Sequence, residues 1–317
     1  MPALRPHILF AEDFNATAIE RMRSVGRVTV LEPRKRRALY EAVSDCDALL
    51  VRSGVHVTEQ LMEHAHRLRV IGRGGVGLEN IDLDAARRRG IVVVYTPGAA
   101  TDAVADLALG LMVALVRKLK SGDASVREAR FYEAREQAYS FELRALTLGI
   151  IGMGRIGRAV AQRCRHGFGM SVLYNDIVRP GLLDVAATPA TKDELYQRAD
   201  IVTLHVPLTD DTQHLIDAAA LARFKSGSLL INTARGAVVD SRALAHALCS
   251  GKLGGAALDV FEPEPLPADH PLMHAPNTLF TPHIGARTHD GLSRMNAVVD
   301  DVISVLRGEP PRYPAWK

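Results

Sequence analysis

At 317 residues the chain is longer than most single hydrophobic cores, so two domains are expected. Hydrophobic residues make up 47% and charged residues 24% of it, as is usual for a globular protein. The net charge of +3, from 39 basic and 36 acidic residues, gives no reason to expect nucleic acid as a partner.

The cysteines and the apolar segments point to a compartment. Cys46, Cys164 and Cys249 have neither a Cys-x-x-Cys spacing nor the spacing of metal ligands, which favours a reducing compartment and no metal site. The amino terminus lacks the apolar run of a signal peptide. The longest apolar stretch, residues 103–116, contains Asp106 and is too short to span a bilayer. We therefore expect a cytoplasmic protein that does not associate with membranes.

Short apolar runs alternate with helical patterns, an arrangement typical of a parallel sheet covered by helices. Over the first hundred residues the predicted strands are 7–10, 27–31, 48–51, 69–71 and 91–94, with amphipathic helices such as 16–23 and 83–89 between them. Thr96-Pro97-Gly98 then breaks the pattern, and a long apolar helix is predicted from about Thr101 to Lys118. The segment from Ser121 to Arg144 is highly charged and shows little apolar periodicity.

A second alternating series begins at Leu146. Its predicted strands are 148–151, 171–174, 201–204, 228–231, 255–259 and 278–280, and a helix from about Thr288 to Arg307 precedes a proline-rich tail. Because the two series are alike, we expect an α/β protein with two Rossmann-like, doubly wound parallel-sheet lobes and a cleft between them.

The pattern Gly-x-Gly-x-x-Gly occurs twice, at Gly72–Gly77 and at Gly152, Gly154 and Gly157. A dinucleotide site also needs a strand before the loop, a helix after it, and an acid about 20 residues further on. The second copy has all three, with Asp176 following the next predicted strand. This copy is therefore predicted to bind a dinucleotide.

The first glycine loop fails the same test. Pro97 stands where the acid should be, and Glu79, Asp82 and Asp84 crowd the start of the next helix, where they would repel a pyrophosphate. In the second loop, Asp176 favours NAD over NADP because a carboxylate would repel a 2′-phosphate, although Arg179 lies nearby.

Three reactive side chains follow predicted strands of the second series. Arg235, Glu264 and His283 come after the strands 228–231, 255–259 and 278–280, so the carboxyl edge of one sheet should hold all three. A guanidinium can bind a substrate carboxylate through two hydrogen bonds, and an imidazolium can protonate a carbonyl as a hydride arrives. A carboxylate beside the imidazole orients it and favours its protonated form.

His205 is the alternative imidazole because it also ends a predicted strand. No matching strand-end acid accompanies it, and we expect its backbone to line the cofactor groove.

These motifs resemble those of the D-isomer-specific 2-hydroxyacid dehydrogenases, the family of phosphoglycerate, glycerate and D-lactate dehydrogenases. The matching segments run in family order through nearly the whole chain. They are residues 51–53, 72–77, 152–157, 232–236, 258–261 with Glu264-Pro265, and 282–285.

The resemblance implies the roles of individual residues. Arg235 would hold the substrate carboxylate, Glu264 would pair with His283, and His283 would be the acid/base. Substrate contacts would come from Ser53, Gly54, Val76, Gly77, Arg235 and His283. NAD contacts would come from Gly152, Gly154, Arg155, Ile156, Gly157, Asp176, His205, Pro207, Thr233, Ala234, Arg235, Asp259, His283 and Gly285.

The resemblance also implies how the chain is divided. A flavodoxin-like substrate-binding domain would comprise residues 1–99 and 286–317, and an NAD-binding Rossmann domain residues 100–285. A homodimer built on the NAD-binding domains is implied, with the 103–116 helix and the polar arm after it at the contact.

Two features depart from the family. Residues 140–147 lack the glycines that commonly precede the cofactor loop, which affects the path of the arm but not the chemistry. The sequence ends about 30 residues after His283, where many phosphoglycerate dehydrogenases have a regulatory extension, so we expect no feedback control through such a domain.

Several alternatives stay open. An NAD-sensing corepressor on the same fold could keep the same three residues, whereas formate oxidation is disfavoured because relatives with that activity have glutamine at the Glu264 position. Arg52 and Arg73 could meet a substrate phosphate, as in phosphoglycerate dehydrogenases. Residues 101–106 look more like glyoxylate and hydroxypyruvate reductases, so both kinds of substrate remain candidates.

Overall fold

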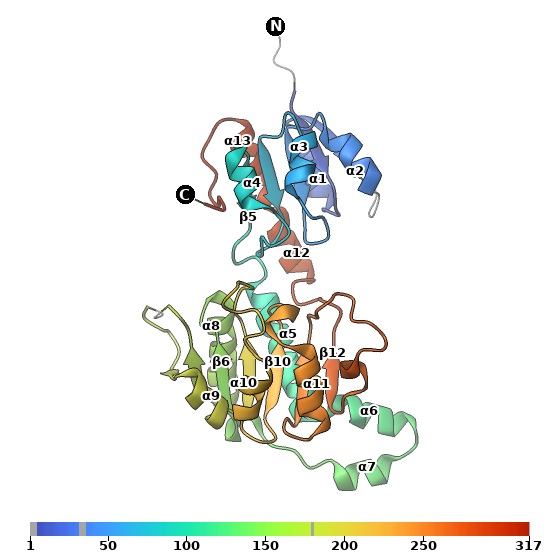
Figure 1. The fold of residues 1–317 in the computed structure, drawn as a ribbon, viewed down its shortest axis with the longest axis vertical. Coiled ribbons are helices and arrows are strands. Elements are labelled where there is room, and N and C mark those ends of the chain that lie inside the picture. Colours follow the sequence, from blue (N-terminus) through green and yellow to red (C-terminus); the bar gives the residue numbers. More distant parts are fainter. Residues whose placement is uncertain (1–4, 32–35, 179–180, 317) are drawn as a thin grey trace. The chain divides into compact units, whose positions relative to one another are not determined.

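The computed structural model describes residues 5–31, 36–178 and 181–316, and the chain divides into two compact units (Figure 1). Unit 1 comprises Met1–Ala100 and Arg287–Lys317, and unit 2 comprises Thr101–Ala286. Each unit has its own parallel β-sheet covered by helices. The prediction of an α/β protein with two parallel-sheet lobes is confirmed.

Unit 1 is built on a five-stranded sheet in the order β2-β1-β3-β4-β5, with every pairing parallel. This is the flavodoxin-like strand order. The strands are β1 (His7–Phe10), β2 (Arg27–Val30), β3 (Ala48–Val51), β4 (Val70–Arg73) and β5 (Val92–Tyr95). The helices are α1 (Ala16–Arg23), α2 (Arg36–Val43), α3 (Glu59–His64), α4 (Leu83–Arg88), α12 (His289–Asn296) and α13 (Val298–Leu306).

Both faces of this sheet are buried, because successive side chains of a strand point to opposite faces. Ile8 and Phe10 of β1 share a core with Val298 and Val302 of α13. Leu9 belongs to the second core, with side chains of α2, α3 and α4. The apolar runs of β1, β3 and β4 are therefore strands buried on two sides, whereas β2 at the sheet edge is partly exposed.

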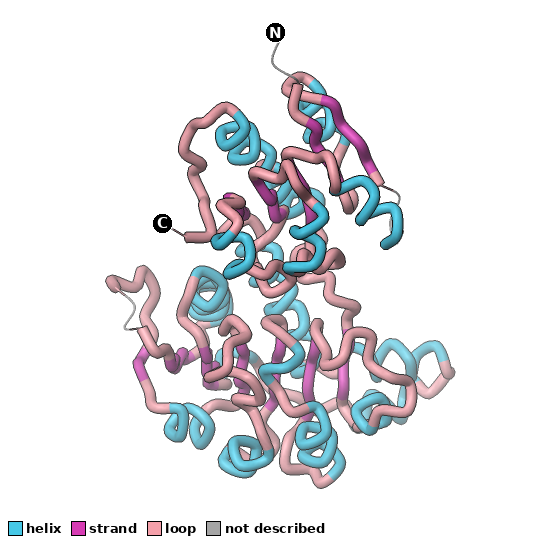
Figure 2. Tube along the Cα trace, turned by 45° about the horizontal axis from the view of Figure 1, so that its top comes forward, coloured by secondary structure: helices cyan, strands magenta, loops and turns pink. Residues whose placement is uncertain are grey.

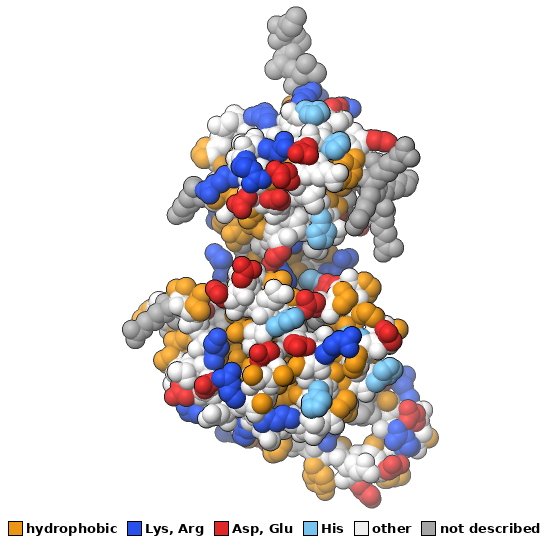
Figure 3. Space-filling model, viewed as in Figure 1, with side chains coloured by type: hydrophobic (Ala, Val, Ile, Leu, Met, Phe, Trp, Pro, Cys, Tyr) orange, Lys and Arg blue, Asp and Glu red, His pale blue; other side chains and the backbone are white. Residues whose placement is uncertain are grey.

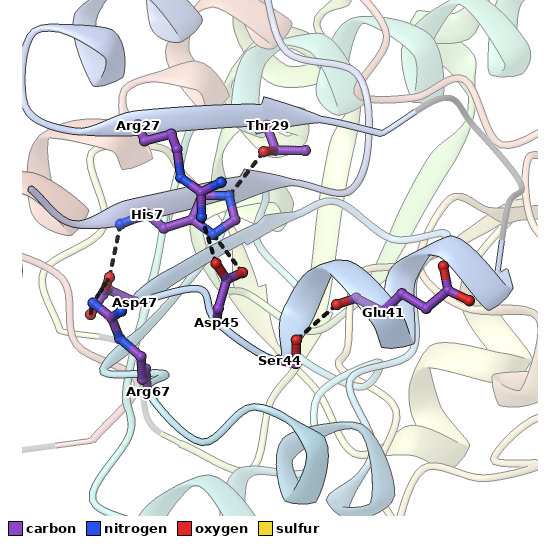
Figure 4. A network of polar contacts seen from close by, with 8 residues as sticks. All are labelled: His7, Arg27, Thr29, Glu41, Ser44, Asp45, Asp47 and Arg67. Carbon is purple, nitrogen blue, oxygen red and sulfur yellow. Dashed lines mark hydrogen bonds and ion pairs between the residues drawn. The ribbon is translucent and has the colours of Figure 1, made fainter.

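A polar network closes the amino end of β1 (Figure 4). The ring of His7 lies between Asp45 (Nδ1 to Oδ1, 2.9 Å) and Thr29 (Nε2 to Oγ1, 2.9 Å). The backbone N–H of His7 donates to Asp47, whose carboxylate also accepts from Arg67. This histidine is a structural residue at the edge opposite the carboxyl ends of the strands.

Unit 2 is built on a seven-stranded sheet in the order β12-β11-β10-β9-β6-β7-β8, again with every pairing parallel. The strands are β6 (Thr147–Ile151), β7 (Ser171–Asn175), β8 (Thr188–Pro189), β9 (Ile201–Leu204), β10 (Leu229–Asn232), β11 (Gly255–Leu258) and β12 (Thr278–Phe280). The chain order reverses between β6 and β9, where doubly wound sheets bind their ligands.

Helices cover both faces of this sheet (Figure 2). The helices of unit 2 are α5 (Thr101–Val116), α6 (Leu119–Arg127), α7 (Phe131–Gln137), α8 (Arg155–Gln162), α9 (Lys192–Arg198), α10 (Ala218–Arg223) and α11 (Ser241–Cys249). Short turns of other helix types are η1 (Leu143–Ala145), η2 (Arg163–Gly167), η3 (Gly236–Val238) and η4 (Pro271–His274). One core joins α5 and α8 to the sheet, and the other joins α9, α10 and α11 to it.

Helices α6 and α7 form an arm (residues 119–137) that projects from the rest of unit 2 (Figure 1). Its apolar side chains are exposed among charged ones (Figure 3), and among the described residues α7 has no buried one. Phe131 and Tyr132 are 52% and 76% exposed. Packing within the arm therefore does not explain why aromatic residues stand at these positions.

Among the described residues, none of the helices combines the length and apolar character that a bilayer crossing requires. In residues 5–31, 36–178 and 181–316, His, Cys, Asp and Glu side chains form no group of three that could hold a metal ion.

Candidate active site

Three neighbouring strands of unit 2 deliver the predicted catalytic residues to one sheet edge. Arg235 follows β10, Glu264 lies in the loop after β11, and His283 follows β12. These strands are adjacent in the sheet and parallel, so their carboxyl ends meet at the same edge.

Glu264 and His283 are hydrogen-bonded to each other. Nδ1 of His283 lies 2.9 Å from Oε2 of Glu264, and Oε1 of Glu264 accepts from the backbone N–H of Phe261 at 3.0 Å. A carboxylate can only accept, so Nδ1 carries the proton and Nε2 is the ring nitrogen left to exchange one. His283 has a φ of +52°, a left-handed conformation that is uncommon for residues other than glycine.

The charges around Glu264 favour its ionised form. Burial alone would raise the pKa of this carboxyl, but hydrogen bonds from His283 and Phe261 and the charges of His283 and Arg235 bring the pKa below its usual value. Nη1 of Arg235 donates to the carbonyl of Ala234 at 2.7 Å. The site thus brings a cation and a carboxylate–imidazole pair close together.

The left-handed turn at His283 is held by Asp259, which is 1% exposed. Its carboxylate accepts from the Thr281 hydroxyl (2.6 Å) and from the N–H groups of Ile284 and Gly285 (2.8 Å each). Its carbonyl accepts from the N–H of His283 at 2.8 Å. Asp259 therefore fixes the loop that carries the imidazole.

Asn232 shapes the turn before Arg235. Its buried side chain donates to the carbonyl of Arg235 (2.9 Å) and accepts from the N–H of Ala234 (3.0 Å). The hydroxyl of Thr233 is buried and has no hydrogen-bond partner among the described residues. An unsatisfied hydroxyl at a predicted cofactor contact is suited to a ligand that supplies the missing partner.

The second glycine loop has the close packing that a dinucleotide site requires. Gly152 follows β6 with a φ of +95°, and a Cβ there would lie 2.6 Å from the carbonyl oxygen of His205. A Cβ on Gly157 would lie 2.1 Å from the carbonyl oxygen of Gly152. One on Gly154, before α8, would meet no described atom within 4 Å. The loop leaves open space beside the start of α8, which Arg155 and Ile156 begin.

Asp176 stands beside this loop after β7. One of its oxygens accepts from the N–H of Met153 at 2.7 Å and the other from that of Val178 at 2.9 Å. The first turn of α8 contains Arg155 and Arg158 and no acid, so the helix terminus suits an anionic pyrophosphate. These residues fit NAD. Arg179 lies outside the described residues.

His205 is poorly suited to donate a proton near neutral pH. Burial lowers the pKa of its imidazole to about 3, and its Nε2 lies 3.0 Å from the Thr203 hydroxyl. The residue as a whole is partly exposed, but Nδ1 is buried without a hydrogen-bond partner among the described residues. Its carbonyl packs against Gly152, and Pro207 follows two residues later.

Besides Arg235 and His283 of unit 2, the predicted substrate contacts belong to unit 1, where Ser53 and Gly54 follow β3. Their loop is clamped by two side chains. The carboxylate of Glu12 accepts from the N–H groups of residues 52 (2.5 Å), 54 (2.9 Å) and 55 (3.2 Å). The amide of Asn80 donates to the carbonyls of residues 52 (2.8 Å) and 55 (2.6 Å).

The first glycine loop is a turn and not a helix start. β4 ends at Arg73, and α4 begins only at Leu83 with Asp82 as its N-cap. Val76 and Gly77 lie in the intervening loop, where Val76 is 38% exposed.

The arginines that were candidates for a substrate phosphate make contacts within unit 1. Arg52 donates to the carbonyls of Asp13 (2.7 Å) and Gly74 (3.3 Å) and to the side chain of Asn296 (2.7 Å). Arg73 is 8% exposed and donates to the carbonyl of Gly74 at 3.2 Å.

Sequence reasoning missed Glu12, Asn80 and a second histidine–carboxylate pair, His214 with Glu262. Each acts across a large sequence separation, for example 48 residues between His214 and Glu262. Local spacing carries no signal for such contacts, because folding alone brings the partners together.

Comparisons with known proteins agree with this geometry. Residues 109–285 match the family model of the D-isomer specific 2-hydroxyacid dehydrogenase, NAD binding domain. A solved structure, that of the D-lactate dehydrogenase from Aquifex aeolicus complexed with NAD and lactic acid, aligns with a TM-score of 0.87. It is 30% identical, and the alignment covers 96% of each chain.

Two curated relatives are similar over most of this chain. The glyoxylate reductase of Korarchaeum cryptofilum is 41% identical over 286 residues, which are 88% of this chain and 85% of the relative. The D-3-phosphoglycerate dehydrogenase of Methanocaldococcus jannaschii is 40% identical over 306 residues, 95% of this chain. This chain spans only 58% of the length of the latter.

Proposed function

Because the chain belongs to the D-isomer specific 2-hydroxyacid dehydrogenase family, we propose that it is an NAD-dependent oxidoreductase that interconverts a small D-2-hydroxy acid and its 2-oxo acid. The observation that carries this proposal is the hydrogen-bonded pair of Glu264 and His283 beside Arg235, at the carboxyl edge of the NAD-binding sheet.

Each of the three residues has one task in the proposed reaction. Arg235 binds the substrate carboxylate, for which its planar guanidinium can provide two parallel hydrogen bonds. Glu264 holds Nδ1–H of His283, so that Nε2 gives a proton to the carbonyl oxygen during reduction and takes one from the hydroxyl during oxidation. NAD, when bound, accepts or supplies the hydride.

The residues proposed to hold NAD surround the open space beside α8. Gly152, Gly154 and Gly157 let the backbone approach the pyrophosphate, and Asp176 would accept from the ribose hydroxyls. Further contacts are proposed from Arg155, Ile156, His205, Pro207, Thr233, Ala234, Arg235, Asp259, His283 and Gly285. For Asp259 this would be a second task, since its carboxylate already fixes the His283 loop.

We assign substrate binding to the domain of residues 1–99 and 286–317, and NAD binding to residues 100–285. Ser53, Gly54, Val76 and Gly77 would contact the substrate from exposed loops after two adjacent strands of unit 1. The internal contacts of Arg52 and Arg73 argue against a phosphorylated substrate, so we favour a glyoxylate- or hydroxypyruvate-type acid.

An initial-rate panel tests the function. It offers glyoxylate, hydroxypyruvate, pyruvate and 3-phosphohydroxypyruvate, each with NADH and with NADPH. We expect turnover of a non-phosphorylated 2-oxo acid with NADH, because Asp176 would repel the 2′-phosphate of NADPH. NADH binding without turnover of any of the four acids would contradict an enzyme and support an NAD-sensing protein.

The same assay tests His283. His283→Ala should lower kcat at least about a hundredfold, the scale for losing a general acid, while NADH binding largely persists because the other proposed NAD contacts remain. His246→Ala, a substitution at an exposed residue of α11, is the matched control and should leave kcat unchanged. Near-normal turnover in His283→Ala would rule out its acid/base role.

We also propose that the protein is a homodimer joined through unit 2. The aromatic residues of the arm lack burial, and Phe141 after it is 68% exposed. Beside the arm a cavity of about 1010 Å³ is lined by residues of α5 and the arm, by Tyr139 and Phe141, and by the amino ends of several strands. Apolar groups exposed together in this way are typical of an interface. In a symmetric dimer, the arm of one copy can pack against the cavity of the other, and the reverse.

For the location we propose the cytoplasm. Cys46, Cys164 and Cys249 are all free thiols. Free thiols persist in a reducing compartment.

A further inference from the structure

Unit 2 contains a second histidine–carboxylate pair that the proposed reaction does not use. Nε2 of His214 lies 2.7 Å from Oε2 of Glu262, and the two side chains are 43% and 39% exposed. His214 comes from the chain between β9 and α10, whereas Glu262 stands two residues before Glu264. An exposed pair of this kind contributes little to the free energy of unfolding, so stability is a weak reason for it.

The backbone around His214 is bound to the loop that carries Arg235. With a φ of +47°, His214 donates its N–H to the carbonyl of Ala237 at 2.7 Å. Ile216 donates to the carbonyl of Val238, and Asp240 donates back to that of Ile216, both at 3.0 Å. His214 is therefore fixed directly to the segment that follows Arg235.

The same segment touches the loop that carries Glu264. A Cβ on Gly236 would lie 1.9 Å from the carbonyl oxygen of Phe261 and 2.7 Å from the nitrogen of Glu262, so the two backbones are in direct contact. His214, whose backbone is bound to the Arg235 segment, binds Glu262 of the other loop through its side chain. This is a second attachment between the two loops. Two points of attachment prevent one loop from rotating on the other.

The orientation of Glu264 depends on the loop held in this way. Its Oε1 accepts from the N–H of Phe261, the residue before Glu262, and its Oε2 binds His283. A shift of Phe261 would move the carboxylate away from the imidazole. Resting on the function proposed above, we infer that His214 and Glu262 are positioning residues, which hold Glu264 against His283 through the Phe261–Glu264 loop.

Steady-state kinetics of three variants test this inference. His214→Ala should lower kcat for the preferred 2-oxo acid by about tenfold, because small displacements of reacting groups are costly, while the Kd for NADH and the Tm stay close to those of the wild type. His214→Gln and Glu262→Gln should keep most of the activity, because an amide can still make the hydrogen bond. His246→Ala is the matched control.

A double-mutant cycle separates positioning from an independent effect. In a Glu264→Ala background there is no carboxylate left to position, so adding His214→Ala should change kcat by less than about twofold. An unchanged tenfold loss in that background, or no loss in the wild-type background, would overturn the inference. A joint fall of Tm and of NADH binding in His214→Ala would also overturn it, in favour of a merely structural role.

A spectroscopic measurement keeps this test separate from that of the reaction itself. In protein with ¹³C-labelled histidines, the ring signal of His283, assigned with His283→Ala, should shift in His214→Ala and return in His214→Gln. An unmoved signal would contradict the positioning role. If the wild type turns over none of the four acids, the proposed function fails, while this signal still reports whether His214 positions the Glu264–His283 pair.

Discussion

At the scale of single residues, Gly152 and Gly154 belong to the same loop, but a side chain would clash with the backbone at Gly152 and has space at Gly154. Gly152 has a φ of +95° and lies against the carbonyl of His205, where a Cβ would come within 2.6 Å. Gly152→Ala should therefore cost about 1–3 kcal/mol of the free energy of unfolding and also weaken NADH binding. Urea unfolding and NADH fluorescence titration measure the two effects.

Gly154→Ala should separate these effects. Its Cβ would meet no described atom within 4 Å, so the protein should stay as stable as the wild type. The methyl group would nevertheless occupy the space beside α8 that the pyrophosphate is proposed to enter, and NADH affinity should fall. Gly122→Ala, at an equally open position on α6, is the control that should affect neither NADH binding nor folding. Normal NADH affinity in Gly154→Ala would mean that the dinucleotide lies elsewhere.

At the scale of elements, the chain after α13 runs along β5, the edge strand of the sheet in unit 1. Pro314 forms an antiparallel bridge with Val94, and Ala315 donates to the carbonyl of Val93 at 2.8 Å. Asp301 of α13, 7% exposed, accepts from the N–H groups of Arg312 (2.8 Å) and Tyr313 (3.1 Å). This carboxylate holds the tail against α13, and the tail covers the edge of β5.

Asp301→Ala should release this tail. Two N–H groups would lose their acceptor, at a cost of about 1–3 kcal/mol, and the residues beyond α13 should become sensitive to proteolysis. Asp300→Ala is the matched control, since its carboxylate makes an exposed ion pair with Arg21 and should change stability by less than about 1 kcal/mol. Urea unfolding and mass spectrometry after limited proteolysis compare the two. Equal stability and an intact tail in both variants would show that Asp301 does not hold it.

The elements that could be predicted from the sequence are the buried ones, because burial produces a recognisable apolar pattern. Residues 7–10 and 48–51 are strands with the predicted bounds, because each is an apolar run buried on both faces. The predicted strand 69–71 is observed as Val70–Arg73, and the predicted helix from Thr288 to Arg307 is two helices that meet at Ala297. Pairing partners and neighbouring helices set such ends, and the local pattern does not contain them.

Elements with little burial were not predicted. β8 has two exposed residues, and α6 and α7 lack an apolar stripe because they project from unit 2. The bridge of the tail to β5 was missed because it depends on Asp301, which is distant in sequence from β5. In the candidate site, strand ends predicted that Arg235, Glu264 and His283 share an edge, but side-chain pairs between loops, such as His214 with Glu262, gave no sequence signal.

At the scale of the whole molecule, the two units differ in how the chain builds them. Unit 2 is one continuous segment with a seven-stranded sheet and two cores of its own. Unit 1 is assembled from two segments, so it needs the final helices to complete the core around Ile8 and Phe10. A continuous segment with its own core is able to fold alone.

Residues 101–286 expressed alone should therefore fold cooperatively. Because the residues proposed to hold NAD all lie in this segment, its Kd for NADH should stay within about tenfold of that of the full chain. It should show no turnover, because Ser53, Gly54, Val76 and Gly77 are absent from it. Calorimetry, NADH titration and the initial-rate panel measure these properties.

The same fragment tests where the proposed dimer contact lies. The arm and the cavity beside it belong entirely to unit 2, so sedimentation equilibrium should find the fragment dimeric, like the full chain. A monomeric fragment from a dimeric full chain would place the contact on unit 1. A fragment that folds but does not bind NADH would show instead that unit 1 contributes to cofactor binding, because the glycine loop, Asp176 and the Arg235–Glu264–His283 group would all still be present.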